Sequence, residues 1–343
     1  MIRILTYYEI NPTAWQKLVE ESPYATWFQT REAYEFYAAN KEEMTPFACG
    51  IERDGELRVV CVGYVTRENS YFKQYFTRRA IIIGGPLIAD SANDEDIARL
   101  LCAIQQPSRL IAQSPYRPIW RNLPIYIETR NFHDYSKWKQ VLEACGFSYQ
   151  PHLNIQVACN ETHTMSEQRR RQVKKAIGNG ATICEAQSEQ EIRDWYQIVA
   201  KLYREKVRTP LFSEEFFLQF YRQERGKYLL VKYNGQVIGG MMCPILEGKA
   251  IYEWYVCGLD EEYKDLYPSV MATNAAIEYA QANGLPLFDF MGAGKPNEPY
   301  GVRDFKMEFG GELVEHGRFL CIRKPLLYKI GKMGVKFLKS KRK

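Results

Sequence analysis

The sequence predicts an α+β protein built from two copies of one unit. Two stretches read as β-hairpins, one turning at Asp54-Gly55 and the other at Asn234-Gly235, because apolar residues flank a dipeptide typical of tight hairpin turns. The turns lie 180 residues apart, about the length of one domain. Each hairpin follows a helix-like stretch and precedes another strand, a helix and a short apolar strand. We therefore expect two domains with mixed, mostly antiparallel sheets flanked by helices.

Capping signals predict where several helices begin and end. Ser188 followed by Glu191 forms a capping box, and an apolar stripe at helical spacing follows it. Asn283-Gly284 ends a helix that begins near Ser269, and Gly146 ends a helix over residues 135–145. The short apolar strands are expected at residues 124–128 and 287–290.

A polar stretch at residues 160–168 separates the two halves. We expect an N-terminal domain over residues 1–160, a C-terminal domain over residues 161–322 and a basic amphipathic tail over residues 323–343. The segment at residues 206–227 has room for only one ordinary helix.

Composition excludes several classes of protein. The chain has 343 residues, 46% of them hydrophobic, and its longest uncharged apolar run covers residues 80–89, half of the roughly 20 needed to cross a bilayer. Nine scattered cysteines without a CxxC spacing indicate reduced thiols, and no two of the four histidines lie at ligand spacing. We therefore expect a cytoplasmic protein with no metal site and no tightly bound cofactor.

Motifs for other chemistries are missing. The segment Gly292-Ala-Gly-Lys295 looks like a phosphate loop, but the first glycine of that motif would fall on Asp289. No GxGxxG motif follows a strand, and no GxSxG motif is found.

The positive charge is concentrated in the tail. The chain has 46 Lys plus Arg against 41 Asp plus Glu, a net charge of +5. Residues 323–343 hold nine cations and no acid, so the remaining body has 37 cations and a net charge of −4. On a helix, Leu326, Ile330, Met333 and Phe337 share one sector beside a flank of lysines. This pattern suits either an anionic membrane surface or a helix docked on the body.

Several segments together resemble a known family. They include Ser22-Pro-Tyr24 with Gln29, Gly84-Gly-Pro86, His152-Leu-Asn154, Phe288-Asp-Phe-Met-Gly-Ala-Gly294 and Tyr300-Gly-Val-Arg-Asp-Phe-Lys306. The chain resembles the Fem aminoacyltransferases of peptidoglycan synthesis and, more broadly, tandem acyltransferase domains of the GNAT superfamily. The resemblance implies two GNAT-like domains with a cleft between them, where an amine of a cell-wall precursor attacks the ester carbonyl of an aminoacyl-tRNA.

The resemblance and the chemistry together suggest catalytic residues. Amine attack on an ester creates a tetrahedral oxyanion, which needs cations or amide donors. Lys306 matches the lysine of the family's Phe-Lys motif and is expected to contact a phosphate or the oxyanion. Asp289 and Glu253 lie on expected splayed strands and are candidate bases for the incoming ammonium. A structural role is the alternative for all three.

Five further residues are expected to bind substrate. Arg208 roughly matches an arginine that contacts the precursor in Fem-like enzymes, and a guanidinium suits a carboxylate or diphosphate. Arg303 and Tyr300 belong to the segment before Lys306. Arg170 and Lys174 fall on one side of a helix, where a diphosphate or a tRNA backbone could bind.

The expected activity is therefore aminoacyl or acyl transfer to an amine of a cell-wall or glycan precursor. An acyl-CoA-dependent N-acyltransferase is the first alternative, although residues 258–269 contain one glycine and four acids, which would repel a pyrophosphate. A non-catalytic GNAT-like protein that binds a membrane or nucleic acid is the second. The tail predicts a peripheral position at the inner face of the membrane.

Overall fold

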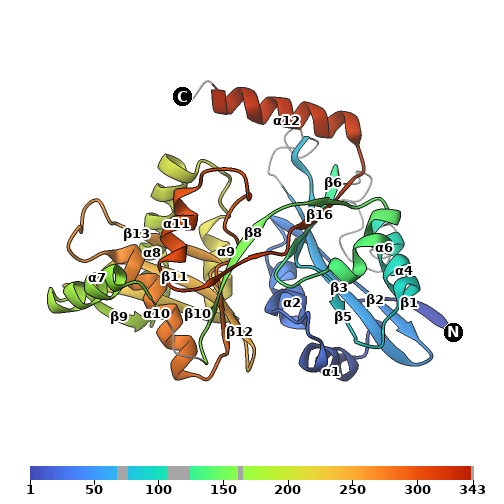
Figure 1. Ribbon diagram of the computed structural model, residues 1–343, viewed down its shortest axis with the longest axis horizontal. Helices are drawn as coiled ribbons and strands as arrows, with labels where there is room; N and C mark the ends of the chain where they lie inside the picture. Colours follow the sequence, from blue (N-terminus) through green and yellow to red (C-terminus); the bar gives the residue numbers. More distant parts are fainter. Residues whose placement is uncertain (68–75, 107–123, 161–164, 341–343) are drawn as a thin grey trace. The chain divides into compact units, whose positions relative to one another are not determined.

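The computed structural model describes residues 1–67, 76–106, 124–160 and 165–340, and the side chains up to Met333. The chain divides into two units, one formed by Met1–Pro151 with His316–Lys343 and the other by His152–Glu315 (Figure 1). Within the described residues, each unit contains one eight-stranded mixed sheet with helices packed against it. The predicted α+β class is confirmed.

The first unit carries its strands in the order β1-β2-β3-β4-β6-β16-β7, with β5 paired to β3. All neighbours are antiparallel except β4 and β6. Its elements are β1 (Ile2–Thr6), α1 (Pro12–Glu21), η1 (Trp27–Gln29), α2 (Arg31–Ala39), β2 (Met44–Arg53), β3 (Glu56–Thr66), β4 (Ala80–Gly84), β5 (Leu87–Ile88), α4 (Asp94–Gln105), β6 (Tyr126–Asn131), η3 (Ser136–Trp138), α6 (Lys139–Ala144), β7 (Ser148–Gln150), β16 (Arg318–Ile322) and α12 (Pro325–Ser340).

The second unit has the strand order β15-β8-β14-β12-β11-β10-β9, with β13 paired to β11. Among the described strands of this unit, only β12 and β14 run parallel. Its elements are β8 (Leu153–Ala158), α7 (Glu167–Gly178), β9 (Thr182–Glu185), α8 (Glu189–Leu202), η4, a π-helix (Tyr203–Val207), α9 (Glu214–Arg222), β10 (Gly226–Tyr233), β11 (Gln236–Leu246), β12 (Ala250–Tyr252), β13 (Tyr255–Gly258), α10 (Pro268–Ala282), β14 (Leu287–Asp289), α11 (Gly301–Met307) and β15 (Glu312–Glu315).

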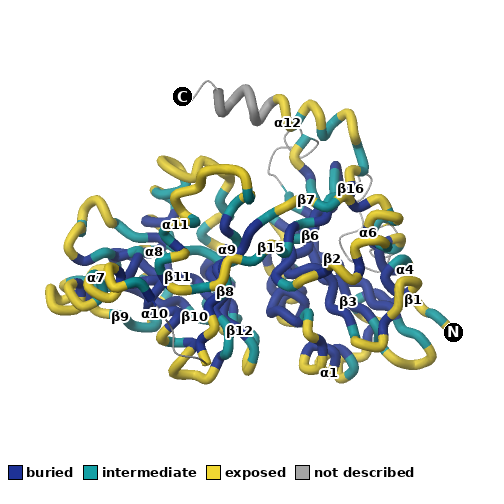
Figure 2. The backbone as a smooth tube through the Cα atoms, in the orientation of Figure 1, coloured by how far each residue is buried: buried dark blue, intermediate teal, exposed yellow. Residues whose placement is uncertain are grey.

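Side-chain alternation explains how the second sheet is covered. Leu229 and Val231 of β10 join one core cluster with the buried side of α10. Tyr228 points to the opposite face, where its ring contacts Trp195 of α8 at 5.1 Å and Phe220 of α9 at 5.8 Å between centroids. The middle of the sheet is therefore covered on both faces, and Figure 2 shows buried segments in its central strands, whereas the edge strands β9 and β15 have no buried residue.

The predicted turns and helix ends are present. Asp54 and Asn234 both have positive φ values, as do the glycines that follow them, which is the backbone that a tight hairpin turn requires. The Ser188 hydroxyl accepts the N–H of Glu191, as expected of a helix N-cap, but the Glu191 carboxylate accepts the N–H of Gln187 instead of that of Ser188, so only half of the predicted capping box is formed. Residues 206–227 contain one α-helix, α9, after the end of the π-helix.

The observed boundaries between the units, at 151/152 and 315/316, differ from the predicted domain boundaries at 160/161 and 322/323. The strand β8, expected in the first domain, pairs with β14 and β15 of the second sheet. The strand β16, expected in the second domain, pairs with β6 and β7 of the first sheet. The chain thus passes between the units twice, at 151–152 and again at 315–316. Residues 323–343 belong to the first unit, where α12 follows β16 directly.

No helix in the described part of the chain is both long enough and apolar enough to cross a membrane.

Candidate active site

The strands of the second sheet separate at Glu253. The strand β12 pairs in parallel with β14 up to the pair Tyr252 and Asp289, and the N–H of Glu253 donates to the Asp289 carbonyl at 2.9 Å. The next strand, β13, pairs only with β11 in the described part of the chain. The predicted separation of the strands is therefore present between β13 and β14. It leaves one edge of β13 without a hydrogen-bonded partner strand among the described residues.

Lys306 reaches the same point from the short helix α11. Its Nζ lies 2.8 Å from Oε1 of Glu253, and it also donates to the carbonyl oxygens of Phe290 at 2.9 Å and Gly292 at 3.0 Å. The side chain is buried, with 8% of the residue exposed. An ammonium has three donor positions, so these contacts use all of them. Lys306 therefore fixes the segment after β14 as well as neutralising Glu253.

The Glu253 carboxyl has an unusual environment for an acid. Burial raises its pKa above the ordinary value, the Lys306 ammonium lowers it in part, and the nearby Asp289 raises it again. A raised pKa brings a carboxyl closer to the pH at which an enzyme works, which is the property expected of a proton acceptor.

Asp289 is held by four hydrogen bonds. Asn154 donates to its two oxygens at 2.9 and 3.0 Å, Gln156 donates at 2.9 Å, and the N–H of Met291 donates at 2.6 Å. The residue is fully buried. Burial raises its pKa, and these donors counteract that effect. Such a satisfied carboxylate ties β14 to β8, so the geometry favours a structural role for Asp289.

Tyr203 lies close to the Glu253 carboxyl, and Tyr300 lies close to Tyr203. The pKa of Tyr203 is raised to about 12, first by burial and then by the neighbouring Tyr300 and Glu253. Tyr203 stands at the start of the π-helix, and Tyr300 caps α11 and is 43% exposed. Tyr300 is therefore the more exposed of the two tyrosines.

The two arginines expected to bind substrate have different surroundings. Arg303 donates to the carbonyl oxygens of Ala293, Lys295 and Glu298, so it braces the loop before α11. Arg208 ends the π-helix with a left-handed backbone and is exposed. Its N–H bonds the Tyr203 carbonyl at 2.6 Å, which places Arg208 on the same turn as Tyr203.

Arg170 and Lys174 do not belong to this cluster. They lie one turn apart on α7 and line a separate groove between α7 and α10. The structure therefore joins Lys306, Glu253 and Asp289, connects Tyr300 to them only through Tyr203, and keeps Arg170 and Lys174 apart.

Sequence reasoning missed three members of the cluster. Tyr203, Asn154 and Gln156 come from elements more than 80 residues before Lys306 along the chain, and none of them stands in a catalytic motif. Asn154 lies in a stretch that resembles the family, which is the one signal that could have identified it. The described residues contain no group of three or more His, Cys, Asp or Glu that could hold a metal ion.

Comparisons with known proteins agree with the fold. Residues 164–307 match the family model of the acetyltransferase (GNAT) domain. The crystal structure of FemX superimposes with a TM-score of 0.70 at 15% identity, covering 96% of this chain and 99% of that one. A search of curated protein sequences finds no match.

Two further structures share the fold over nearly their whole lengths. The C-terminal domain of a putative lysylphosphatidylglycerol synthetase from Agrobacterium fabrum has a TM-score of 0.57 at 10% identity, with 94% of this chain and 95% of that one covered. A tandem GNAT protein from the clavulanic acid biosynthesis pathway has a TM-score of 0.51 at 8% identity, with 94% and 98% covered.

These matches confirm the predicted resemblance to Fem-like proteins with tandem GNAT-like domains at the level of the fold. The GNAT match also confirms that the chain carries a domain of acyltransferase type, as predicted.

Proposed function

We propose that the protein transfers an aminoacyl group from an ester donor to an amine of a cell-wall or glycan precursor. The observation that carries this proposal is the buried pair of Lys306 and Glu253 at the point where β13 leaves β14, inside a domain of GNAT type. The shared fold with FemX and the Fem-like motifs support the choice of an aminoacyl group.

In this reaction the lone pair of the amine attacks the ester carbonyl carbon. The C–N bond forms, the carbonyl oxygen becomes an oxyanion, and the C–O bond to the donor then breaks. The proton lost by the amine passes to Glu253 and then to the leaving oxygen, because Glu253 has the raised pKa that a proton acceptor needs. Lys306 keeps Glu253 in place, and because its three donor positions are taken by the protein it acts on the oxyanion through its charge and not through a hydrogen bond.

The amino end of α10 argues against CoA as the donor. GNAT enzymes usually hold the CoA pyrophosphate on free amides at a helix N-terminus. Here Pro268 has no N–H, and the N–H of Ser269 donates to Oδ1 of Asp260 at 3.0 Å. The Ser269 hydroxyl donates to the same carboxylate. An acid of the chain thus takes the place of the anion, which favours an aminoacyl ester.

A membrane-linked precursor is the acceptor class that the tail favours. The start of α12 is fixed to the first unit, since the N–H groups of Arg323 and Lys324 both bond the Ile125 carbonyl. Beyond it, Leu326, Ile330 and Met333 are 74%, 44% and 64% exposed on a helix without acids. We propose that this side of α12 lies in an anionic membrane surface.

The direct test is to incubate the full-length protein with charged tRNA or acetyl-CoA and with amine-bearing precursors, and to follow the product mass. Product from charged tRNA supports the proposal, and product from acetyl-CoA alone refutes the ester donor. Glu253→Gln should abolish turnover while the far-UV CD spectrum is kept. The matched control is Glu247→Gln, an exposed acid in the turn before β12, which should leave turnover unchanged. No product with either donor would favour a non-catalytic protein.

A further inference from the structure

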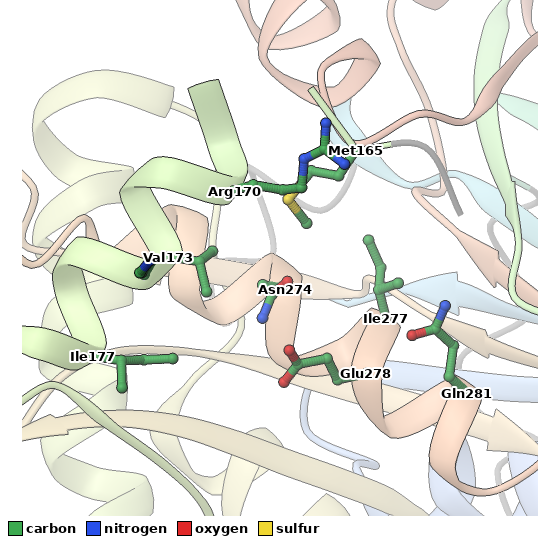
Figure 3. A pocket seen from close by; sticks show the side chains of 9 residues that line it. Met165, Arg170, Val173, Ile177, Asn274, Ile277, Glu278 and Gln281 are labelled. Atoms are coloured by element: carbon green, nitrogen blue, oxygen red, sulfur yellow. The ribbon is translucent and has the colours of Figure 1, made fainter. Parts of the chain in front are cut away.

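A groove between α7 and α10 lies on the second unit, apart from the residues of the candidate active site (Figure 3). Its volume is about 470 Å³, enough for a small organic molecule. Nine residues line it: Met165, Arg170, Val173, Lys174, Ile177, Asn274, Ile277, Glu278 and Gln281.

The charges of α7 indicate what the groove attracts. Three of its cations have acidic partners, namely Arg169 with Glu308, Arg171 with Glu167 and Lys175 with Asp265. The remaining two, Arg170 and Lys174, form no ion pair with any residue that the structure describes. Both belong to the groove lining. Unpaired cations one helical turn apart are a ready binding site for an acid group.

Asn274 supplies a second, independent observation. The residue is 5% exposed, and its side-chain Nδ2 has no hydrogen-bond partner among the described residues. Buried amide groups are nearly always hydrogen-bonded, and leaving one unpaired costs about 1–3 kcal/mol. In Figure 3, Asn274 lies in the middle of the lining residues, with Arg170 on one side and Glu278 on the other. A ligand that accepts from this amide would remove the cost.

The rest of the lining is apolar. Val173 and Ile177 on α7 face Ile277 on α10, and Ile177 is 56% exposed although it is a large aliphatic residue. Glu278 on the far side makes no ion pair with a described residue either, so the groove keeps its acid and its cations apart. The lining thus offers two cations, one free amide donor and an aliphatic surface.

We propose that this groove binds an amphipathic organic anion. Its acid group lies between Arg170 and Lys174, an acceptor atom takes the Asn274 amide, and its apolar body packs on Val173, Ile177 and Ile277. The acid is a carboxylate on an acyl chain or a phosphate on a nucleoside, and both offer the same chemistry to the two cations. This site does not depend on the proposed transfer reaction.

The test is isothermal titration of the full-length protein with octanoate, adenosine 5′-monophosphate and inorganic phosphate. One of the two organic anions should bind saturably at one site, and the one that binds identifies the source of the acid group. The double variant Arg170→Gln/Lys174→Gln should weaken that binding by roughly 30-fold or more. The matched control is Arg171→Gln/Lys175→Gln, which removes the same charge from the same helix outside the groove lining and should change binding less than about 3-fold.

Asn274→Leu adds a readout that charge alone would not move. The change should weaken binding about 5-fold or more without lowering the urea midpoint of unfolding, because the amide has no partner to lose. The proposal is overturned if neither organic anion binds at about 5 mM, or if inorganic phosphate binds as well as they do. Equal weakening in the two double variants, or a lower urea midpoint for Asn274→Leu, would overturn it as well.

Discussion

Replacing Lys306 by Met should strongly destabilise the protein. The variant leaves the Glu253 carboxyl buried without its cation, beside the equally buried Asp289, and removes the donor to two main-chain carbonyls. Breaking a buried ion pair on one side typically costs about 3–5 kcal/mol. We therefore expect the free energy of unfolding to fall by about that amount, measured by urea denaturation with circular dichroism and tryptophan fluorescence as two probes.

A double variant separates the pair from its surroundings. Lys306→Met with Glu253→Leu replaces the ion pair by apolar side chains, which is often neutral in free energy. We expect it to recover most of the lost stability. A single variant as stable as the unmodified protein, or a double variant no better than the single one, would refute the assignment of a closed, buried pair.

The same two variants test the chemical role of the pair. If Lys306 and Glu253 act in the reaction, the double variant should stay inactive although its stability has returned. A stable double variant with normal turnover would show that the pair only supports the fold. Stability and turnover must therefore be measured on the same preparations.

Four further predictions follow from other features of the structure. Burial raises the pKa of Asp289, so the folded state binds the Asp289 proton more tightly than the unfolded state and loses stability as the pH rises from about 4 towards neutral. Urea titrations should therefore show Asp289→Asn gaining stability relative to the unmodified protein over this pH range. A stability difference that does not change with pH would contradict this prediction. The double variant Leu326→Glu/Ile330→Glu removes exposed apolar surface that contributes about 2 kcal/mol to membrane binding, so it should weaken binding to anionic vesicles roughly 30-fold. The control Ile4→Glu, at another exposed aliphatic residue, should leave vesicle binding unchanged. Absence of vesicle binding by the unmodified protein would refute the membrane proposal. Calorimetry should detect no binding of acetyl-CoA at about 1 mM, and tight binding would contradict the interpretation of the amino end of α10. Asp260→Ala should lower the free energy of unfolding by about 1 kcal/mol, measured by urea denaturation, because the variant loses the cap of this helix.

Local patterns explain which parts of the fold could be predicted. The turn at Asn234-Gly235 and the cap at Ser188 depend on neighbours within a few residues, so the sequence specifies them directly. The position of β16 between β6 and β7 depends on partners about 170 to 200 residues away, and no local pattern records it. For this reason the predicted domain boundaries differ from the observed ones.

The candidate site shows the same limit. Lys306 and Glu253 were each selected from the sequence, but their direct contact spans 53 residues and could not be foreseen. Their mutual neutralisation changes the interpretation, because a lysine with all three donors in use is less available to a substrate than a solvated one. Tyr203 was missed since only the folded chain brings it to the Glu253 carboxyl.

The double passage of the chain between its halves affects its synthesis and its inheritance. On the ribosome, the first sheet stays incomplete until β16 emerges, after the whole second unit has been synthesised, so the first unit cannot finish folding before the second is made. A gene cut after codon 160 would yield two fragments that each lack an interior strand, since β8 would leave with one and β16 with the other. Recombination that keeps both sheets whole therefore needs cuts at 151/152 and 315/316, because the second unit is one continuous segment whereas the first is made of two.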